Sequence, residues 1–469
     1  MVITEQASDA THFILKRSEL NTGKLFVEFY LPEYQSLLQK LRERPYPLYS
    51  LSEISKRIFD GPFGSDRKID MYQETGIPYM RVKDIQPEGI KFNELVYISE
   101  EKHNRFKRSC VLPGNVLITI AGRVGTAAVF PDSFSEGNIT GHIVGIELSE
   151  DINPYYIATF INSYLGEFQV IRLAHRTTRP ELNLSEVGQI LIPIPPLNVQ
   201  NTIAQVMQDA YEKKEKMIIE ANNLLDSIDV YILSKLGIIL DNELKTINFI
   251  ISLSELKNNR FDVEAMDSNF NANYYSNISW IELHEIAYFP KKTKIPSKNP
   301  ENQYFYIGMS DVDEKFGEVH IRHLLGQDIK ANKIIFQGND VIFARIEPCV
   351  YNGKVALIPT DIEEALGSTE LIVARPKNNI LPEFLFWILR SELIQRQIAG
   401  KMTGTTGRRR LPDAIFKFLK LPKVPLELQK IIAEEANRRK DEAKRLSKEA
   451  EKGIKEAKLL VEKMILGME

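Results

Sequence analysis

Two stretches of this sequence, IPIPPLNVQNTIA at residues 192–204 and LPKVPLELQKIIA at residues 421–433, are near copies of each other. Aligned without gaps, they share six residues, and each shared pair is 229 positions apart in a chain of 469 residues. The shared pairs are Pro193/Pro422, Pro196/Pro425, Leu197/Leu426, Gln200/Gln429, Ile203/Ile432 and Ala204/Ala433. Self-similarity at a fixed offset indicates a fold built from repeats, so the chain is expected to contain two copies of one structural unit.

Each copy leads into a long polar segment with an apolar residue at every third or fourth position. The first series is Ile203, Met207, Ala210, Lys214, Met217, Ala221, Leu224, Ile228, Tyr231 and Lys235, and the second is Ile432, Ala436, Arg439, Ala443, Leu446, Ala450, Gly453, Ala457, Leu460 and Met464. Both are heptad patterns, which are typical of helices that pack on each other. We predict helices within residues 196–238 and 425–469, each about 40 residues and about 60 Å long, ending near Gly237 and Gly467.

The segments before the two helices also correspond. GNVLITIAGRVGTAAVFP at residues 114–131 parallels GNDVIFARIEPCVYNGKVALIP at residues 338–359, and each reads as a strand, a turn and a strand. INPYYIATFIN at 152–162 likewise parallels ILPEFLFWILR at 380–390. The predicted fold is therefore α+β, with globular domains at 1–195 and 239–424, each followed by its long helix.

An antiparallel pairing of the two helices would have a geometric consequence. The two globular domains would be related by an approximate two-fold axis, as in dimeric DNA-binding proteins that place two elements on one duplex. Here a single chain would supply both halves. Because the two domains differ in sequence, the two half-sites that they read are expected to differ as well.

Composition restricts the protein class only weakly. The net charge is −3, so nucleic-acid binding would need local basic patches or partner proteins. Cys110 and Cys349 are the only cysteines, which excludes a disulfide framework and a CxxC zinc motif, and no metal site is predicted. We expect a cytoplasmic protein, since no signal-peptide pattern and no apolar run long enough for a membrane span is present.

Motifs of catalysis are missing from the sequence. It contains no phosphate-binding G-x-x-x-x-G-K-[ST] loop and no HExxH zinc motif. NPYY at residues 153–156 approaches a base-flipping methyltransferase motif, but its repeat counterpart, LPEF at 381–384, reads as a plain helix start. A binding protein with no catalytic residues and no cofactor of its own is therefore favoured over an enzyme.

The order of these features resembles the specificity (S) subunits of type I restriction-modification systems over nearly the whole chain. The resemblance rests on FDGPFGSD at 59–66, GIPYMRVKDI at 76–85, the strand block at 114–131, and the PPLNVQNTIA entry to the first helix, with recurrence in the second half. It implies two target-recognition domains and two spacer helices. The second half lacks a DGPFGS equivalent, and VPLELQ lacks the first proline of the PP pair.

The resemblance also implies a function and a set of partners. The protein would be a noncatalytic reader of a split, asymmetric double-stranded DNA target whose gap is set by the helices. It would recruit two adenine methyltransferase (M) subunits and, through them, the motor and nuclease restriction (R) subunits. S-adenosylmethionine, ATP and magnesium would be bound by these partners.

Two polar loops just upstream of the helices are the best candidates for DNA contact. They are LAHRTTRPELN at 173–183 and GKMTGTTGRRRLP at 400–412. Arginine can bond two acceptors of guanine, and threonine can contact base edges or the thymine methyl group. The candidate residues are His175, Arg176, Thr177, Thr178 and Arg179 in the first loop, Lys401, Thr403, Thr405, Thr406, Arg408, Arg409 and Arg410 in the second, and Arg81, Lys83, Arg123 and Arg345 outside the loops.

Other interpretations stay open from the sequence. The chain could be an enzyme with an unrecognised site, a coiled-coil scaffold that never binds DNA, or a stand-alone DNA-binding protein without a methyltransferase partner. An enzyme would act without partners, and a scaffold would tolerate charge reversal in both loops. The sequence also leaves open the recognised bases, the spacer length and the face that binds a methyltransferase.

Overall fold

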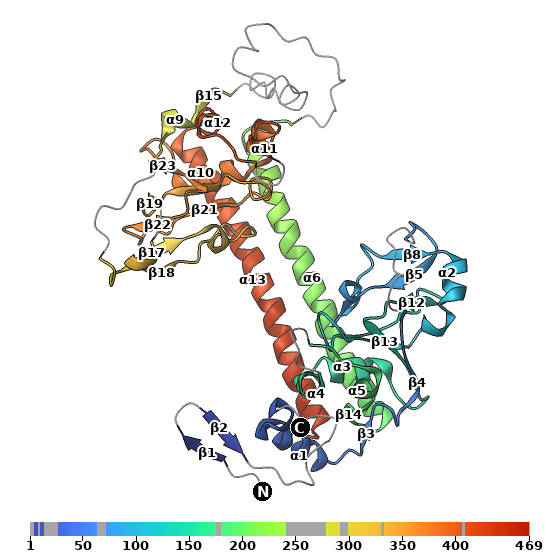
Figure 1. Cartoon of the computed structure of the whole chain (residues 1–469). Helices are drawn as coiled ribbons and strands as arrows, with labels where there is room; N and C mark the ends of the chain where they lie inside the picture. The colour runs from blue at the N-terminus through green and yellow to red at the C-terminus, as the bar shows by residue number, and fades with distance from the viewer. Residues whose placement is uncertain are drawn as a thin grey trace. The chain divides into compact units, whose positions relative to one another are not determined.

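The computed structural model describes residues 4–7, 10–13, 27–62, 72–174, 180–240, 278–290, 299–329, 333–405 and 409–468. The chain divides into two compact units. Unit 1 comprises Met1–Lys216 with Glu449–Glu469, and unit 2 comprises Met217–Lys448. Two long helices, α6 (Leu197–Lys235) and α13 (Leu426–Ile465), each contribute one part to each unit (Figure 1).

Unit 1 combines short strands with short helices. Its strands are β1 (Thr4–Ala7), β2 (Ala10–Phe13), β3 (Leu48–Ser50), β4 (Ser55–Asp60), β5 (Ile77–Met80), β6 (Ile85–Gln86), β7 (Gly89–Ile90), β8 (Val96–Ile98), β9 (Cys110–Val111), β10 (Val116–Thr119), β11 (Ala127–Val129), β12 (Gly137–Ile139), β13 (Ile143–Leu148) and β14 (Leu191–Pro193). Its helices other than the long pair are η2 (Val27–Tyr30), α1 (Pro32–Arg42), η5 (Val82–Asp84), α2 (Glu100–Arg105), η6 (Lys107–Ser109), α3 (Pro154–Ile161), α4 (Tyr164–Leu173) and α5 (Leu184–Gly188).

Unit 2 is built from the same kinds of element. Its strands are β15 (Trp280–Glu282), β16 (Ala287–Tyr288), β17 (Gln303–Ile307), β18 (Arg322–Leu325), β19 (Ile334–Phe336), β20 (Val341–Ala344), β21 (Val355–Leu357), β22 (Ala365–Gly367), β23 (Leu371–Pro376) and β24 (Lys420–Pro422). Its short helices are α9 (Leu283–Ile286), η8 (Met309–Asp311), η9 (Gly326–Asp328), α10 (Pro382–Arg390), α11 (Glu392–Ile398) and α12 (Asp413–Lys417).

The two four-stranded sheets of unit 2 repeat those of unit 1 strand for strand. The first sheet has the order β11-β10-β13-β4 in unit 1 and β21-β20-β23-β16 in unit 2, with antiparallel pairs throughout. The second has the orders β8-β5-β12-β9 and β18-β17-β22-β19, and its central pair is parallel in both units. The two-stranded sheets β3–β14 and β15–β24 also correspond. The predicted α+β fold with two tandem copies is confirmed.

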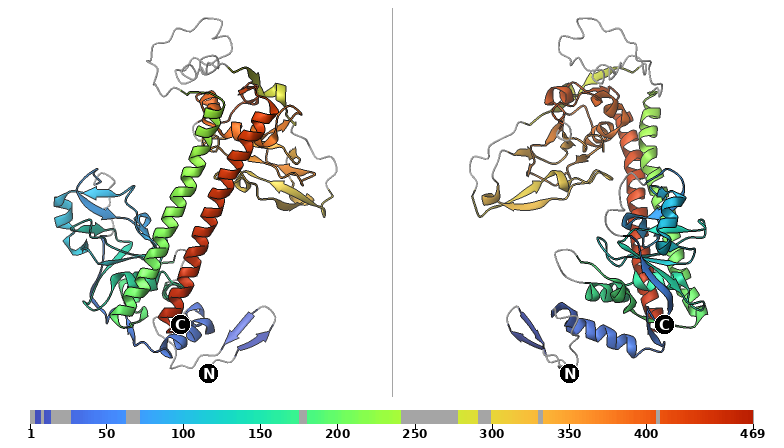
Figure 2. Two further views of the ribbon diagram at one scale, coloured as in Figure 1. Left: turned by 180° about the vertical axis from the view of Figure 1, so that it is seen from behind. Right: turned by 45° about the vertical axis from the view of Figure 1, so that its right-hand side comes forward.

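The two long helices run antiparallel. In unit 1, Ile203 and Met207 near the start of α6 share one buried cluster with Val461 and Ile465 near the end of α13. In unit 2, Ile228 and Ile232 of α6 share a cluster with Ile432 and other residues near the start of α13. Figure 2 shows the two helices side by side from two further directions. The predicted pairing of the helices is thus confirmed within each unit.

The buried face of each helix drifts away from the predicted seam. Lys235 is exposed, and Ile232 and Leu236 are buried in its place. Leu460 is likewise 49% exposed, whereas the next residue, Val461, is buried. An α-helix rotates by about 20° per heptad relative to a strict seven-residue repeat, so four heptads accumulate about 80°. That is close to the angle of about 100° between neighbouring residues, and the seam therefore moves by one position.

The residues shared by the two copies explain how each long helix is attached. The buried side chain of Gln200 accepts a hydrogen bond from the Asn153 amide just before α3 (2.9 Å) and donates to the Pro195 carbonyl (2.9 Å). Gln429 does the same with the Leu381 amide before α10 (2.9 Å) and the Val424 carbonyl (2.9 Å). This glutamine therefore links the first turn of each long helix to the helix that covers the sheet.

Both long helices end in the same way. Gly237 (φ 63°) and Gly467 (φ 62°) adopt the left-handed conformation that favours glycine. The amides of Ile238 and Met468 then donate to the carbonyls of Leu233 and Lys463 in the last turn. The predicted helix ends near the two glycines are confirmed.

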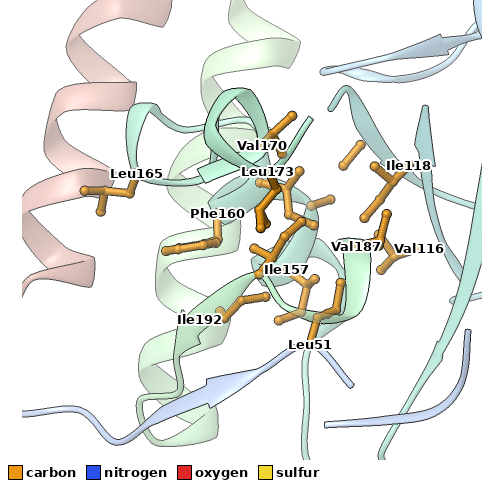
Figure 3. Packing of buried hydrophobic residues seen from close by; sticks show 14 of the residues in the cluster. Leu51, Val116, Ile118, Ile157, Phe160, Leu165, Val170, Leu173, Val187 and Ile192 are labelled. Carbon is orange, nitrogen blue, oxygen red and sulfur yellow. The ribbon is translucent and has the colours of Figure 1, made fainter. Parts of the chain in front are cut away.

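The main core of unit 1 lies between the first sheet and the short helices. Figure 3 shows side chains from α3 and α4, such as Ile157 and Leu173, on the side that faces Val116 and Ile118 of β10, whereas Phe160 points away from that strand. Gly166 lies in the first turn of α4, where a Cβ atom would be 2.3 Å from the Phe160 carbonyl oxygen, so only glycine permits this close turn between α3 and α4. The loop 173–183 follows directly from this rigid helix pair.

Candidate nucleic-acid interface

The first predicted DNA-contacting loop is held at both ends by regular structure. It follows α4, and it returns through a β-bridge between Ala121 and Glu181 and a 3.0 Å hydrogen bond from the Leu182 amide to the Ile120 carbonyl. Its five candidate residues, at positions 175–179, lie outside the described residues. The loop therefore starts and ends on the helix pair and on the turn that joins β10 to β11.

Arg123 lies in the turn between β10 and β11, two residues from the bridge that closes the first loop. Its exposed side chain donates to Gln86 Oε1 (2.6 Å), to the Ile85 carbonyl (3.3 Å) and to Thr126 Oγ1 (3.2 Å). These partners are neutral, so the positive charge of Arg123 is not cancelled by a carboxylate in any ion pair of the described residues. The structure thus places the charge of Arg123, a residue outside the loop, beside the point where the loop ends.

The second loop, 400–412, follows α11 and returns in the same manner. Thr403 and Arg410 form a β-bridge with backbone hydrogen bonds of 2.9 and 2.7 Å, and the Leu411 amide donates to the Arg345 carbonyl (2.8 Å). Arg345 is the first residue after β20, and Ala121, which closes the first loop, is the second residue after β10. The two loops thus return to equivalent places in the two units. Thr406 and Arg408 lie outside the described residues.

Ion pairs restrain two arginines beside the second loop. Arg410 forms a bidentate pair with Glu370, with Nε and Nη2 each 2.9 Å from a carboxylate oxygen, and this contact raises the pKa of Arg410. Arg345 pairs with Asp413 (2.9 Å) and donates to the Leu411 carbonyl (3.0 Å). These two guanidinium groups therefore bind carboxylates and a backbone carbonyl of the same chain near the ends of the loop.

The remaining described candidates of this loop are differently placed. Thr403 and Thr405 are exposed, whereas Lys401 is half-buried, and burial lowers its pKa. No ion pair of Arg409 occurs among the described residues, and its carbonyl accepts a 3.1 Å hydrogen bond from the Glu347 amide. Arg409 is thus the described arginine of this loop whose charge is best placed for an external anion.

Arg81 and Lys83, the other two candidates of unit 1, are bound to carboxylates. Arg81 pairs with the buried carboxylate of Asp84 through two hydrogen bonds of 2.9 and 3.0 Å, and Lys83 pairs with the exposed Glu94. In unit 2, Asp311 occupies the place of Asp84 and pairs with Arg322 (2.7 Å). The repeated aspartate caps the short helix after β5 or β17, so a structural role accounts for Arg81.

The structure also shows basic and aromatic side chains on a strand-like segment whose aromatic residues, Phe305 and Tyr306, are expected from the sequence to lie in the core rather than to stack on bases. On the β17–β18 hairpin, Phe305 is 42% exposed, and its ring lies 5.1 Å from that of His323. On the opposite face of the strands, Lys333 lies over the Tyr306 ring, as does Arg322, which also pairs with Asp311. Such surfaces suit nucleic acid because bases stack on aromatic rings and cations attract phosphates. Side chains alternate between the two faces of paired strands, and the register places Phe305 opposite His323 on one face. This register cannot be inferred from the sequence alone.

Among the described residues, one group of side chains could hold a metal ion, namely His103, Cys110 and Glu136 near β9 and β12. None of the helices described has a segment both long enough and apolar enough to cross a bilayer.

Comparison with known proteins is consistent with these two repeated units. The sequence matches the family model of the type I restriction modification DNA specificity domain twice, over residues 57–224 and 275–438. The type I restriction enzyme EcoAI specificity subunit of Escherichia coli is 29% identical over 157 residues, which are 33% of this chain and 26% of that protein. The EcoBI specificity subunit of Escherichia coli is 24% identical over 221 residues, which are 46% of this chain and 42% of that protein. The matched segments thus span less than half of each of these relatives.

A solved structure shares the fold. It belongs to a study of complex assembly and conformational transition of the type I R-M system. Its chain aligns with a TM-score of 0.50 at 14% identity, covering 90% of this chain and 97% of that chain. The similarity therefore extends over both units and both long helices.

Proposed function

We propose that this chain, which belongs to the family of type I restriction modification DNA specificity domains, is a noncatalytic subunit that reads a split, asymmetric DNA target. One observation carries the proposal: two units of the same topology present a loop with basic and hydroxyl side chains at the same place in the fold. In unit 1 this loop joins α4 to α5, and in unit 2 it joins α11 to α12.

The backbone pairing at the ends of each loop suits the loop to reading a DNA sequence. Backbone pairing next to β10 or β20 fixes where the loop leaves the globular part, while the threonine and arginine side chains of the loop supply donors, acceptors and methyl groups. The two loops differ in sequence, with LAHRTTRPELN in one and GKMTGTTGRRRLP in the other. The two half-sites would therefore differ, and the target would lack two-fold symmetry.

The partners follow from the charge and from the family. A net charge of −3 provides little general attraction to phosphates, so tight DNA binding would need further protein surface. We infer that adenine methyltransferase subunits provide that surface and bind S-adenosylmethionine, and that motor and nuclease subunits join through them with ATP and magnesium. The assembly would act on DNA in the cytoplasm.

A map of DNA methylation tests this function directly. The chain would be co-expressed with the methyltransferase gene that neighbours its own gene, in a host without adenine methylation, and modified adenines would be located by single-molecule sequencing. We expect one bipartite motif with a fixed gap that disappears when the chain is omitted. A stable complex that modifies no DNA would instead favour a coiled-coil scaffold, and the lack of any complex would favour a stand-alone DNA-binding protein.

A further inference from the structure

Three side chains with metal-binding atoms come together at the edge of the second sheet of unit 1. His103 lies on α2, Cys110 begins the edge strand β9, and Glu136 directly precedes β12. Because β9 pairs with β12 with Cys110 opposite Asn138, Cys110 and Glu136, which are 26 positions apart in the chain, both become neighbours of His103. The donor atoms of the three side chains all lie within 4.8 Å of one another.

The hydrogen bonds around His103 fix which ring nitrogen is available. The side-chain amide of Asn138 donates to the Phe106 carbonyl (3.1 Å) and to Ser109 Oγ (3.2 Å), which turns its carbonyl oxygen toward His103 Nδ1 at 2.6 Å. Nδ1 must therefore carry the proton. In the neutral ring the lone pair is then on Nε2, which faces Glu136 and Cys110. An outer hydrogen bond to one nitrogen is the usual arrangement of a histidine that binds a metal through the other.

The spacing of the three donors fits a tetrahedral Zn²⁺ ion. Bond lengths to zinc of about 2.0–2.1 Å for nitrogen and oxygen and about 2.3 Å for sulfur give tetrahedral edges of about 3.3 Å for N–O and about 3.5 Å for O–S. In the structure, His103 Nε2 is 3.2 Å from Glu136 Oε2, and Cys110 Sγ is 3.5 Å from the same oxygen. Two of the three edges thus already have the required length.

A cation is already held at this place by the protein itself. The Lys107 ammonium group lies 3.1 Å from His103 Nε2 and 3.3 Å from Glu136 Oε2. Its side chain is 61% exposed, so it can turn into solvent without unpacking the fold, whereas His103 is buried and cannot move away. The donors therefore form a site that attracts positive charge and whose present occupant can leave.

We propose that His103, Cys110 and Glu136 form a binding site for a divalent transition-metal cation of the Zn²⁺ type, with water as a fourth ligand. On binding, the Cys110 thiol loses its proton to solvent, its sulfur becomes a thiolate ligand, and the Lys107 ammonium group moves out unchanged. This site goes beyond the proposed DNA-reading function and does not depend on it.

Cobalt provides the test because Co²⁺ adopts the same geometry as Zn²⁺ and is coloured. The full chain, stripped of metal and without DNA or partners, would be titrated with Co²⁺ while its absorption spectrum is recorded. We expect one equivalent to bind with a thiolate-to-cobalt charge-transfer band, and Zn²⁺ to abolish that band by competition. Cys110→Ser should remove the band, and Lys107→Met should tighten binding about two- to fivefold by removing the competing cation.

The second cysteine of the chain provides a matched control. Cys349→Ser should leave the band and the affinity unchanged, since Cys349 lies in unit 2. Absence of the band in the wild-type chain overturns the proposal, as does a band that persists in Cys110→Ser and disappears in Cys349→Ser. If Cys110→Ser fails to fold, as judged by circular dichroism, the Lys107→Met chain decides, because an unchanged affinity there contradicts a site at this position. Methylation activity enters none of these measurements, so the two proposals can fail separately.

Discussion

At the scale of single residues, internal ion pairs determine which basic side chains are available to DNA. Arg81, Arg345 and Arg410 all carry charge, but each also holds a carboxylate of its own chain. A phosphate or a base would have to displace Asp84, Asp413 or Glu370 to bind these arginines. Arg123 and Arg409 have no such competitor among the described residues, and we therefore expect them to contribute more to binding than their neighbours do.

A repeated glutamine has a structural role at the same scale. Gln200 and Gln429 are each buried, and each joins the first turn of a long helix to the start of the helix that covers the first sheet. A second repeated pair, Gln169 and Gln397, uses the side-chain amide to bind both backbone groups of Leu191 and Lys420 in β14 and β24. The glutamines therefore complete backbone hydrogen bonding that no strand supplies at these positions.

We predict that Gln200→Leu lowers the free energy of unfolding by about 1–3 kcal/mol. The change leaves the part-buried Asn153 backbone amide and the buried Pro195 carbonyl without their partners, and an unpaired buried group costs about that much. Urea unfolding followed by circular dichroism would measure it. Gln205→Leu on the exposed face of the same helix is the control, with an expected effect below about 0.5 kcal/mol. Equal effects of the two substitutions would show that the link from Gln200 contributes nothing.

At the scale of elements, small side chains lie in the contact between the antiparallel helices within unit 2. Ala221 of α6 and Ala443 of α13 are both completely buried in one cluster of unit 2, together with Leu446. Polar residues on the predicted seam are paired instead of buried alone. Arg439 donates to the Ser227 carbonyl and hydroxyl (2.9 Å each), and Lys214 pairs with Glu88 (3.3 Å). We propose that this helix pair sets the gap in the DNA target.

We predict that a matched deletion in both helices shortens the gap in the DNA target. Removal of residues 218–224 from α6 and 440–446 from α13 takes one heptad from each, preserves the helix faces, and removes about 10 Å of length at 1.5 Å per residue. At about 3.4 Å per base pair, the gap would shorten by about three base pairs, or binding would be lost. Methylation mapping measures the gap, and an unchanged gap would exclude the helices as the element that sets it.

Deletion of residues 218–224 alone is the comparison for this experiment. It shifts α6 against α13 by seven residues and leaves Ala443 without its partner Ala221. We expect this single deletion to destabilise the chain and abolish methylation, while the double deletion retains a folded protein. Thermal unfolding distinguishes the two cases.

At the scale of the whole molecule, one chain contains two units of the same design, which we propose to be two readers of the DNA target. Strand order, the parallel pair in the second sheet and the loop that returns beside β10 or β20 are common to both units. The loop sequences are not. Each reader should therefore act on its own half of the target.

We predict that arginine substitutions in one loop change one half-site only. Arg176→Ala with Arg179→Ala should relax the motif on one side of the gap, and Arg409→Ala should relax it on the other, because each lost bidentate contact to a base removes about 1–3 kcal/mol of discrimination. Arg438→Ala, an exposed arginine of α13 that pairs with Glu435, should leave the motif unchanged. Loss of specificity on the same side with both loop variants would contradict a two-reader arrangement.

The sequence by itself determined the repeat, the class of fold and both ends of the long helices. These features depend on local signals, namely shared residues at one offset, apolar residues at helical spacing, and glycine where the chain must turn left-handed. It also identified the strand pairs that precede the helices. The glutamine at positions 200 and 429 was part of the repeat, but its role as a link to α3 and α10 was visible only in the fold.

Only the tertiary structure determined which side chains are in contact with one another. Helical drift moved the buried seam from Lys235 and Leu460 to Leu236 and Val461, because a strict heptad does not match 3.6 residues per turn. Folding also paired Arg410 with Glu370, 40 residues away, and placed His103 beside Cys110 and Glu136. Such contacts join residues that are distant in the chain, and they depend on strand register and side-chain direction, which residue spacing in the sequence does not specify.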